Sequence, residues 1–350
     1  MKTVALSTDH LLYRDPSIGM LDIFCELYPE ARAFTLAHKV GAILGHLELR
    51  SIESTGLSKK SETLDQLMQK SFLIPTLADQ LRIPCSIDIM FNLSRGLSHS
   101  FRKCESTKLI SYFYDDLLLS RSPASFSERF FRSYLKNWSR KGLAQVDLLM
   151  VPHEAFKTQL EPYVKGEIEV VPPFFKLSDF PLIPSKIFKK DFYCIHATGL
   201  TPKEARSMVE LFDQRKMRYR FIGEDEHLSE LKKTLPADHF FGARCAGELA
   251  PLLASSRGLI DFEMSYFPLQ SLQGMAEGLR VLYRQNSPGA VFLETPYAKA
   301  SDLQSLGRDL DEIDKNFEQD EPQKIRAYVM DYHDLKFKGS LLRAMKSFSA

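Results

Sequence analysis

The chain has 350 residues, of which 44% are hydrophobic and 26% charged, and its net charge is +1. This length predicts two domains, and the composition excludes disordered and fibrous proteins. The balanced charge provides no field to steer nucleic acid, so we expect no nucleic-acid partner. No apolar run approaches the roughly 18 residues that span a bilayer, and the first residues lack a secretory pattern. We therefore expect a cytoplasmic location.

The cysteines and histidines do not form a metal-binding pattern. Five cysteines lie far apart in the sequence, without the close spacing of a metal site. We expect them to be reduced, buried thiols. The histidines are scattered and form no His-Glu-x-x-His motif, so no metal ligands are predicted. The cysteines are Cys25, Cys85, Cys104, Cys194 and Cys245.

The first half of the chain alternates between strand and helix patterns, as a doubly wound parallel sheet requires. Short β-branched and apolar runs predict buried strands, and apolar residues at helical spacing predict helices between them. The predicted strands are 2–8, 31–37, 86–94, 108–114 and 146–152, and the predicted helices are 20–29, 125–141 and 154–163.

The alternation restarts after a proline-bearing, basic segment, which we interpret as a linker at 176–190. The predicted strands of the second half are 192–197, 219–223, 239–242, 258–262 and 280–284, and the predicted helices are 203–214, 227–235, 247–256 and 269–278. We therefore expect two parallel α/β domains, 1–175 and 191–325. A helical segment, 326–350, follows and could return to the first domain.

A local excess of positive charge lies between Arg95 and Lys141, with ten Lys/Arg against four Asp/Glu and many interleaved aromatic residues. We expect a solvated helix face whose aromatic side chains turn to the core. The alternative is that the part from Phe126 to Lys141 holds an anionic acceptor or rests on the inner face of the membrane.

The ordered series of landmarks resembles the family-4 glycosyltransferases of the GT-B fold, most closely the bacterial O-antigen and exopolysaccharide mannosyltransferase group. In the first half the resemblance rests on CELYPEARAFTL, NLSRGLSHSFRK, KLISYFYD and the run YLKNWSRKGLAQVDLLMVPHEAF. In the second half it rests on FIGEDEHLSELKK, FFGARCAGELAPLLASSRGLI and the MAEG turn.

The resemblance implies two Rossmann-like domains that face each other across a cleft. A nucleotide-diphosphate sugar would bind mainly to the second domain and the acceptor to the first. The reaction would retain the stereochemistry of the sugar and need no metal or other cofactor. Helix N-termini at the carboxyl ends of the strands would support a diphosphate there.

The chain departs from this family where the donor diphosphate is clamped. The family carries an Arg after the first strand of the second domain and a Lys five residues later. Here Gly199 stands in the place of the Arg and Glu204 in that of the Lys. Lys203 and Arg206 are the available substitutes. Losing two cations would forfeit charge-assisted contacts of roughly 1.5–3 kcal/mol each.

Two further departures affect the donor sugar and the ribose. The family's two glutamates, eight positions apart, fall here on Ser265 and Gln273. Gln273 can still hydrogen-bond a ribose, and Glu263 could replace Ser265 only after a shift in register. A histidine of the family, close to the donor sugar, falls on Tyr114. Asp115 follows it and would be the better proton acceptor if burial raised its pKa.

Other donor-binding positions survive. By the resemblance, Gly223 lets the backbone pass close to the nucleotide and Glu248 lies near the base. Backbone amides at Gly289 and Ala290 would approach the phosphates, and Gly19 in the first loop would leave room for donor or acceptor.

Two functional interpretations follow. The first is a hexosyltransferase that passes a sugar from a nucleotide diphosphate to a surface glycan or lipid-linked acceptor, with Asp115 or Tyr114 at the sugar. The second is a degenerate relative that binds a glycan, a nucleotide or a partner enzyme without turnover. The five replacements together favour it, because they remove charge or polarity from one site.

Overall fold

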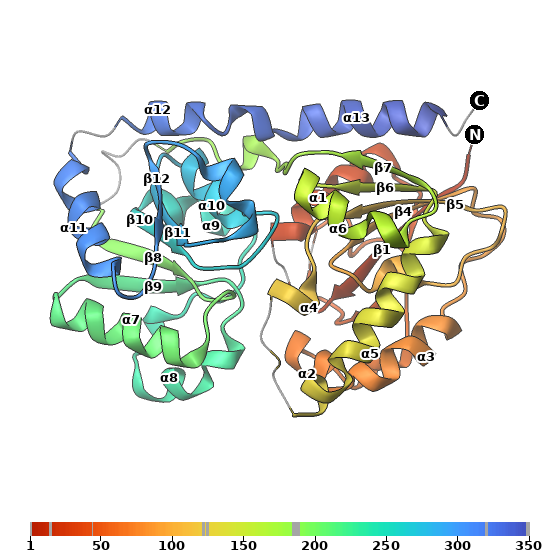
Figure 1. Cartoon of the computed structure of the whole chain (residues 1–350), viewed down its shortest axis with the longest axis horizontal. Coiled ribbons are helices and arrows are strands. Elements are labelled where there is room, and N and C mark those ends of the chain that lie inside the picture. The colour runs from red at the N-terminus through yellow and green to blue at the C-terminus, as the bar shows by residue number, and fades with distance from the viewer. Residues whose placement is uncertain are drawn as a thin grey trace. The chain divides into compact units, whose positions relative to one another are not determined.

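The computed structural model describes residues 2–13, 16–43, 45–120, 123, 126–183, 190–318 and 321–347. The chain splits into two compact units (Figure 1). The first comprises Met1–Pro173 with Phe337–Ala350, and the second comprises Phe174–Lys336. Among the described helices, none has both the length and the apolar character needed to cross a membrane.

The first unit is built on a seven-stranded parallel sheet with the order β3-β2-β1-β4-β5-β6-β7. The central strands are almost entirely buried, as expected for a parallel sheet covered on both faces. The five strands predicted above are all present, and the three-residue edge strand β3 and the short strand β7 complete the sheet. The strands are β1 Val4–Leu11, β2 Arg32–His38, β3 Ile52–Ser54, β4 Ile89–Ser94, β5 Lys108–Phe113, β6 Leu148–Val151 and β7 Glu167–Val170.

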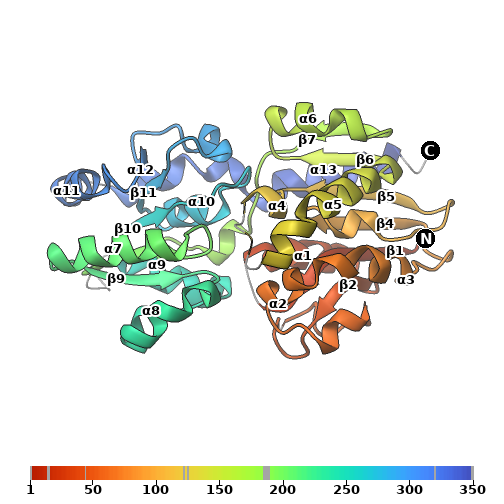
Figure 2. The same cartoon turned by 60° about the horizontal axis from the view of Figure 1, so that its bottom comes forward.

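Helices cover this sheet, and a helix from the end of the chain joins them (Figure 2). On α13, Phe337 packs edge-on against Phe24 and Tyr112, with ring centroids 5.6 Å apart in each pair. Phe337 and Leu341 are buried, so α13 contributes to the core of the first unit. The helices are α1 Pro16–Leu27, α2 Leu64–Gln69, α3 Ile74–Gln80, α4 Leu117–Ser120, α5 Phe126–Gly142, α6 Glu154–Leu160 and α13 Asp334–Ser347.

The second unit contains a five-stranded parallel sheet with the order β12-β11-β10-β8-β9. Its strands are β8 Phe192–His196, β9 Arg218–Ile222, β10 Ser256–Asp261, β11 Arg280–Arg284 and β12 Ala298–Ser301. Its helices are α7 Pro202–Gln214, α8 Ser229–Thr234, α9 Ala246–Ala254, α10 Leu269–Ala276, α11 Leu306–Asn316 and α12 Pro322–Ala327.

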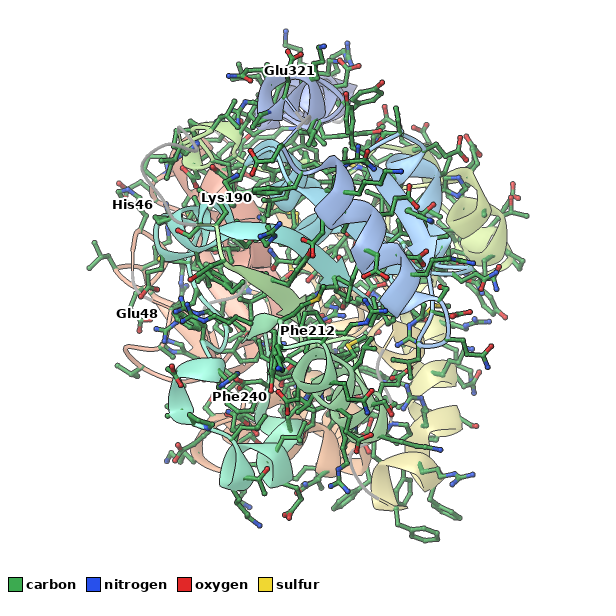
Figure 3. The ribbon with its side chains drawn as sticks, turned by 90° about the vertical axis from the view of Figure 1, so that its left-hand side faces the viewer. His46, Glu48, Lys190, Phe212, Phe240 and Glu321 are labelled. Carbon is green, nitrogen blue, oxygen red and sulfur yellow. A yellow bond between two sulfur atoms is a disulfide. The ribbon has the colours of Figure 1, made fainter. Side chains whose placement is uncertain are left out.

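The strand predicted at 239–242 is wrong. The chain makes only an isolated bridge there, between Phe221 and Phe240, after a short 3-10 turn. Two backbone hydrogen bonds, from Phe241 to Phe221 at 2.9 Å and from Gly223 to Gly242 at 3.1 Å, hold the segment beside β9. Phe240 also stacks on Phe221 with ring centroids 5.3 Å apart. Figure 3 shows Phe240 together with Phe212 of α7, which is fully buried in the core of this unit.

The predicted linker lies at the start of the second unit. Residues Leu177–Asp179 form a single 3-10 turn, and Phe180 is buried against Phe175. Residues 184–189 lie outside the described part of the chain.

A disulfide joins Cys85 to Cys104, so the prediction of five reduced core thiols is wrong for this pair. These cysteines lie in the segments that precede β4 and β5, which are neighbouring parallel strands, and their Cα atoms are 5.2 Å apart. Cys25 and Cys194 are buried thiols as predicted.

Candidate functional site

The carboxyl edge of the five-stranded sheet is the first candidate site. Strand β8 pairs with β9 on one side and with β10 on the other, so the chain's winding reverses between β8 and β10. Ligands of open α/β sheets bind outside the carboxyl ends of the strands at such a reversal point. The last residues of β8, β10 and β11 are His196, Asp261 and Arg284, so this edge carries ionisable side chains.

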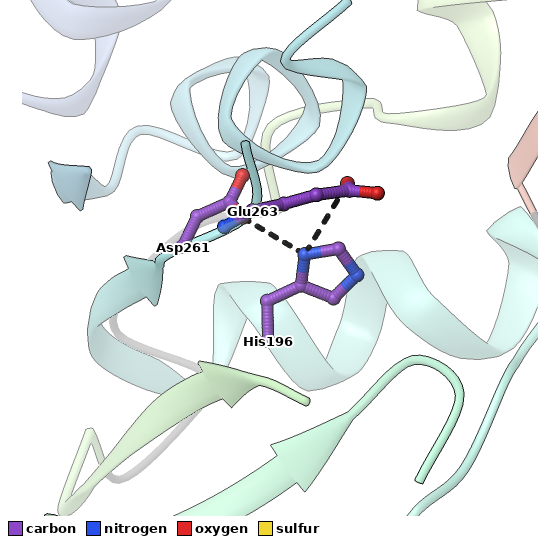
Figure 4. Close-up of side chains that lie close together, drawn as sticks. All are labelled: His196, Asp261 and Glu263. Atoms are coloured by element: carbon purple, nitrogen blue, oxygen red, sulfur yellow. Dashed lines mark hydrogen bonds and ion pairs between the residues drawn. The ribbon is translucent and has the colours of Figure 1, made fainter. Parts of the chain in front are cut away.

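His196, Asp261 and Glu263 form a compact group at this edge (Figure 4). The Nδ1 atom of His196 lies 2.9 Å from Oδ1 of Asp261 and 3.9 Å from Oε2 of Glu263. Ser271 of α10 donates to the other oxygen of Asp261 at 2.6 Å. Although burial opposes its charge, the neighbouring His196 and these hydrogen bonds hold the pKa of Asp261 below its ordinary value. An ionised Asp261 can only accept a hydrogen bond, so the Nδ1 atom of His196 must carry a proton.

This group has the residue types of a cation site. Each of the three side chains offers one possible ligand atom, and these atoms all lie within 4.8 Å of one another. Among the described residues, this is the one group of three or more His, Cys, Asp or Glu side chains that is this close. However, Nδ1 of His196 already engages Asp261, and a cation would have to displace that proton. The geometry therefore serves first to orient the imidazole.

Two glycines allow the loops at this edge to pack closely. A Cβ on Gly199 would lie 2.3 Å from the Cα of Glu263. Gly223 has φ +85°, and a Cβ there would lie 2.6 Å from Cδ2 of His196 and 2.7 Å from Oγ1 of Thr198. Protein atoms thus fill the space beside both glycines. The close packing of the loops therefore explains why these two positions are glycine.

Arg284 fastens these loops together. Its guanidinium donates to Oε1 of Glu204 at 2.7 Å, to the carbonyl of Phe262 at 2.5 Å and to the carbonyl of Gly199 at 3.2 Å. Glu204 also closes a capping box with Thr201 at the start of α7. Burial opposes ionisation of Glu204, but Arg284 and Thr201 lower its pKa. The charge of Glu204 is therefore neutralised within the protein.

The two substitute cations lie on α7, which starts six residues after β8 ends. Lys203 is exposed in the first turn of the helix, at the carboxyl edge of the sheet. Arg206 is exposed one turn further on, and its charge acts on Glu230 of α8. Lys203 is thus the cation nearer to the helix N-terminus, where an anion is most favoured.

The residues predicted around the sugar and ribose differ in their surroundings. The hydroxyl of Ser265 is engaged in a turn with the backbone of Phe267. Gln273 is only 4% exposed, and its Oε1 atom has no hydrogen-bond partner in the described part of the chain. A buried amide oxygen in this state is a ready acceptor for a ligand hydroxyl.

The loop predicted to meet the phosphates is a 3-10 helix, Pro288–Leu293. The amide of Gly289 donates to the carbonyl of Ser265 at 2.9 Å, and that of Ala290 donates to Ser287 at 3.0 Å. Both amides are therefore engaged inside the protein. Glu248 is exposed in the first turn of α9, where Arg244 and the thiol of Cys245 contact its carboxylate.

A second candidate site lies at the carboxyl edge of the seven-stranded sheet. Asp115 follows β5 and is 2% exposed, and Arg95 donates to its Oδ2 at 2.8 Å. Asp116 is also buried, and its Oδ1 accepts from the amide of Leu118 at 3.0 Å. Burial, reinforced by the charge of Asp115, raises the pKa of Asp116 to about 6. Asp116 is therefore a carboxyl group with a raised pKa, and its neighbour Asp115 forms an ion pair with Arg95.

Neighbouring residues complete this edge. Tyr114 is half-buried, and its ring stacks 6.4 Å from that of Tyr112. Asp9, near the end of β1, accepts hydrogen bonds from the amides of Arg95 and Ser98 at 2.8 and 2.7 Å. Asp9 therefore fixes the loop that carries Arg95.

Gly19 lies in helix α1 and not in the loop before it, where it was predicted. Apart from its chain neighbours and the backbone of its own helix, no described atom lies within 4 Å of the position that a Cβ on Gly19 would take.

Sequence reasoning missed Asp9, Arg95 and Arg284 as members of these sites. Asp9 and Arg284 had a signal in the sequence, because each lies at the carboxyl end of a predicted apolar run. Arg95 follows β4 in the same way. The sequence does not reveal the order of the strands within each sheet. That order places Asp9 next to Arg95 in the seven-stranded sheet and Arg284 near His196 and Asp261 in the five-stranded sheet.

The seven- and five-stranded parallel sheets are those of the GT-B glycosyltransferase structures, so the chain has this fold. It is similar over 99% of its length to sucrose-phosphate synthase from Thermosynechococcus elongatus, with 14% identity, a TM-score of 0.69 and 100% of that chain covered.

Two other solved structures have the same architecture. Anabaena HepE, in complex with UDP and glucose, is 14% identical over 99% of this chain and 100% of HepE, with a TM-score of 0.67. An α,α-trehalose 6-phosphate synthase from Burkholderia multivorans is 8% identical over 100% of this chain and 99% of its own, with a TM-score of 0.60. No protein-family model and no curated protein matches the sequence.

Proposed function

We propose that this protein binds a nucleotide-diphosphate sugar at the carboxyl edge of its five-stranded sheet. It would transfer the hexose, with retention and without a metal, to a surface glycan or lipid-linked acceptor. UDP-glucose is the first donor to test, because HepE, which has the same fold, was solved in complex with it. The narrower assignment to the family-4 mannosyltransferases rests on the motif series alone.

The observation that carries this proposal is the state of Gln273. Its Oε1 atom is buried and has no hydrogen-bond partner in the described part of the chain. An unsatisfied buried acceptor costs roughly 1–3 kcal/mol, which a ligand hydroxyl would recover. Gln273 occupies the place where the resemblance implies a glutamate that binds the ribose.

Lys203 is the proposed partner of the diphosphate. It lies in the first turn of a 13-residue helix whose N-cap and N3 residues form a capping box. A phosphate there would meet both the helix dipole and the ammonium group. Arg206 would add a weaker, longer-range attraction from the next turn.

The Asp115–Asp116 pair is the proposed proton-handling group on the first unit. A carboxyl group with a pKa of about 6 changes charge close to neutral pH, as a general base or acid must. Asp116 would exchange the proton, and Asp115, paired with Arg95, would maintain its raised pKa. Tyr114 would contribute a ring face beside them.

Binding without turnover is the second candidate function. Arg284, the best-placed guanidinium at the edge of the five-stranded sheet, is engaged by Glu204 and by two backbone carbonyls. Asp261 and Glu263 add negative charge at the same edge. Little positive charge at this edge is therefore left unpaired. Catalysis needs such charge to stabilise the diphosphate as it leaves, so its shortage lowers the rate of transfer more than it weakens nucleotide binding.

Thermal-shift titration with UDP, GDP and their glucose and mannose conjugates tests the proposal. A ligand at a hundredfold excess over its dissociation constant should add about 2.7 kcal/mol of stability. We expect Gln273→Leu to weaken binding about tenfold and Gln273→Glu to strengthen it, because a carboxylate accepts more strongly from hydroxyls.

Lys203→Ala should also weaken binding, whereas Lys315→Ala, an exposed lysine on α11, serves as the matched control and should not. Binding with no release of nucleotide diphosphate in the presence of acceptors would favour the second candidate function. No response to any nucleotide would contradict both.

A further inference from the structure

The outward face of α5 carries an aromatic stripe. Phe126, Phe130 and Tyr134 follow one another at intervals of four residues, which places them along one side of the helix. Their exposed fractions are 84%, 71% and 54%. The prediction that the aromatic residues of this helix turn to the core is therefore wrong for these three.

The buried side of α5 is equally well defined. Leu135 is fully buried, and Ser139 and Glu128 are nearly so. Glu128 is the one acidic residue of the helix, and Arg132 lies 3.5 Å from it. Arg132 also donates to the carbonyl of Leu118. The only negative charge of α5 thus faces inward and is paired.

The outward face, in contrast, carries positive charge. Arg129 and Lys141 are exposed, and Lys136 and Arg140 are half-buried at its border. Arg140 lies over the ring of Tyr163 at 4.7 Å, so Tyr163 extends the aromatic surface beyond the helix. Aromatic and basic side chains without acidic ones are typical of helices that lie in the surface of an anionic bilayer.

The stripe continues onto the neighbouring elements. Helix α5 lies beside α2 and α3 in Figure 1. The turn that connects α2 to α3 carries Phe72, which is 46% exposed. The ring of Phe72 lies 5.7 Å from that of Phe131. The apolar surface is therefore wider than one helix face, as a monotopic contact requires.

We propose that α5, together with Phe72, docks the protein on an anionic lipid surface. The rings would enter the boundary between headgroups and acyl chains, and the four cations would contact lipid phosphates. Lipid, and not a protein groove, is the occupant, because the exposed rings lie among basic side chains and the one acidic residue of α5 faces inward. The inference does not depend on the proposed nucleotide-sugar site.

Trp138 makes this proposal directly testable. It is the only tryptophan of the chain and lies on α5, one turn beyond Tyr134. The full-length protein would be mixed with vesicles of phosphatidylcholine alone, or with half of the lipid replaced by phosphatidylglycerol. We expect sedimentation with the anionic vesicles only, reversed by high salt, and quenching of Trp138 by brominated anionic lipids.

The variant Phe126→Ser with Phe130→Ser should lower the affinity for these vesicles about tenfold or more. Leu49→Ser, which replaces an exposed apolar residue of the same unit, is the matched control and should leave it unchanged. Because these side chains are exposed, the circular dichroism spectra of both variants should equal that of the parent protein.

Three results would overturn the proposal. The first is no binding to anionic vesicles. The second is binding without quenching of Trp138, which would assign the contact to another surface. The third is self-association that the double substitution abolishes while vesicle binding is absent, which would assign the stripe to an interface between copies.

Discussion

The two neighbouring aspartates after β5 give a prediction whose size follows from the structure. Asp116 has a pKa of about 6 in the folded protein, against an ordinary value of 3.8, chiefly because it is buried. The folded state therefore binds this proton more tightly than the unfolded state, and stability falls as pH rises from about 4 to 6. Two pKa units correspond to roughly 3 kcal/mol.

Asp116→Asn removes this titration but keeps an oxygen that can accept from Leu118. We expect the variant to gain roughly 2–3 kcal/mol over the parent protein at about pH 7.5 and almost nothing at about pH 4. Urea unfolding followed by Trp138 fluorescence measures it, because this single tryptophan lies in the same unit.

Asp115→Asn is the matched control and should have the opposite sign. Asp115 forms an ion pair with Arg95, and both side chains are largely buried. Removing one partner of such a pair costs roughly 3–5 kcal/mol. The reasoning is refuted if Asp116→Asn is no more stable than the parent at neutral pH, or if its advantage persists unchanged in acid.

Three further predictions concern stability. Arg284→Gln should cost roughly 2 kcal/mol in urea unfolding followed by circular dichroism, because three acceptors lose their donor; an unchanged midpoint would contradict the fastening role. Replacing Cys85 and Cys104 by Ser should cost about 3 kcal/mol, and the reducing agent that opens the bond in the parent should have no effect on this variant. Gly223→Ala should cost roughly 1–3 kcal/mol in the same assay, whereas Gly247→Ala, with open space beside it, should cost nothing; equal effects would refute the close packing with His196.

Hydrophobic periodicity predicted most of the elements correctly because the strands of parallel sheets are buried on both faces. The exceptions have local reasons. Residues 239–242 make a single bridge and two backbone hydrogen bonds to β9 and its end, which is too short a pairing to count as a strand. Strands β3 and β12 are short edge strands with half-exposed residues, and α11 lies in an acidic segment whose apolar face is narrow.

The candidate sites were predictable in outline and not in detail. The order of the motifs indicated which loops form the sites. Contacts between residues far apart in the sequence determine which charges in those loops are neutralised. Glu204 stands where the resemblance implies a lysine, and Arg284, 80 residues away, neutralises its charge. Likewise the sequence could not tell that the pKa of Asp116 is raised, because that depends chiefly on its burial in the folded protein.

The surface of α5 illustrates a third limit. Aromatic residues four apart indicate a stripe, but periodicity alone does not say whether the stripe or the opposite side faces the core. Glu128 and Leu135 occupy the core side, so the stripe is exposed.

Hydrogen–deuterium exchange with and without UDP-glucose tests the central claim, a nucleotide-sugar site at the carboxyl edge of the five-stranded sheet, most directly. The account predicts slower exchange in 196–203 and 261–274, lost in the Gln273→Leu protein, while 148–170 is unaffected. Unchanged exchange in both segments at saturating concentrations of every nucleotide sugar tried, or protection confined to other parts of the chain, would contradict it.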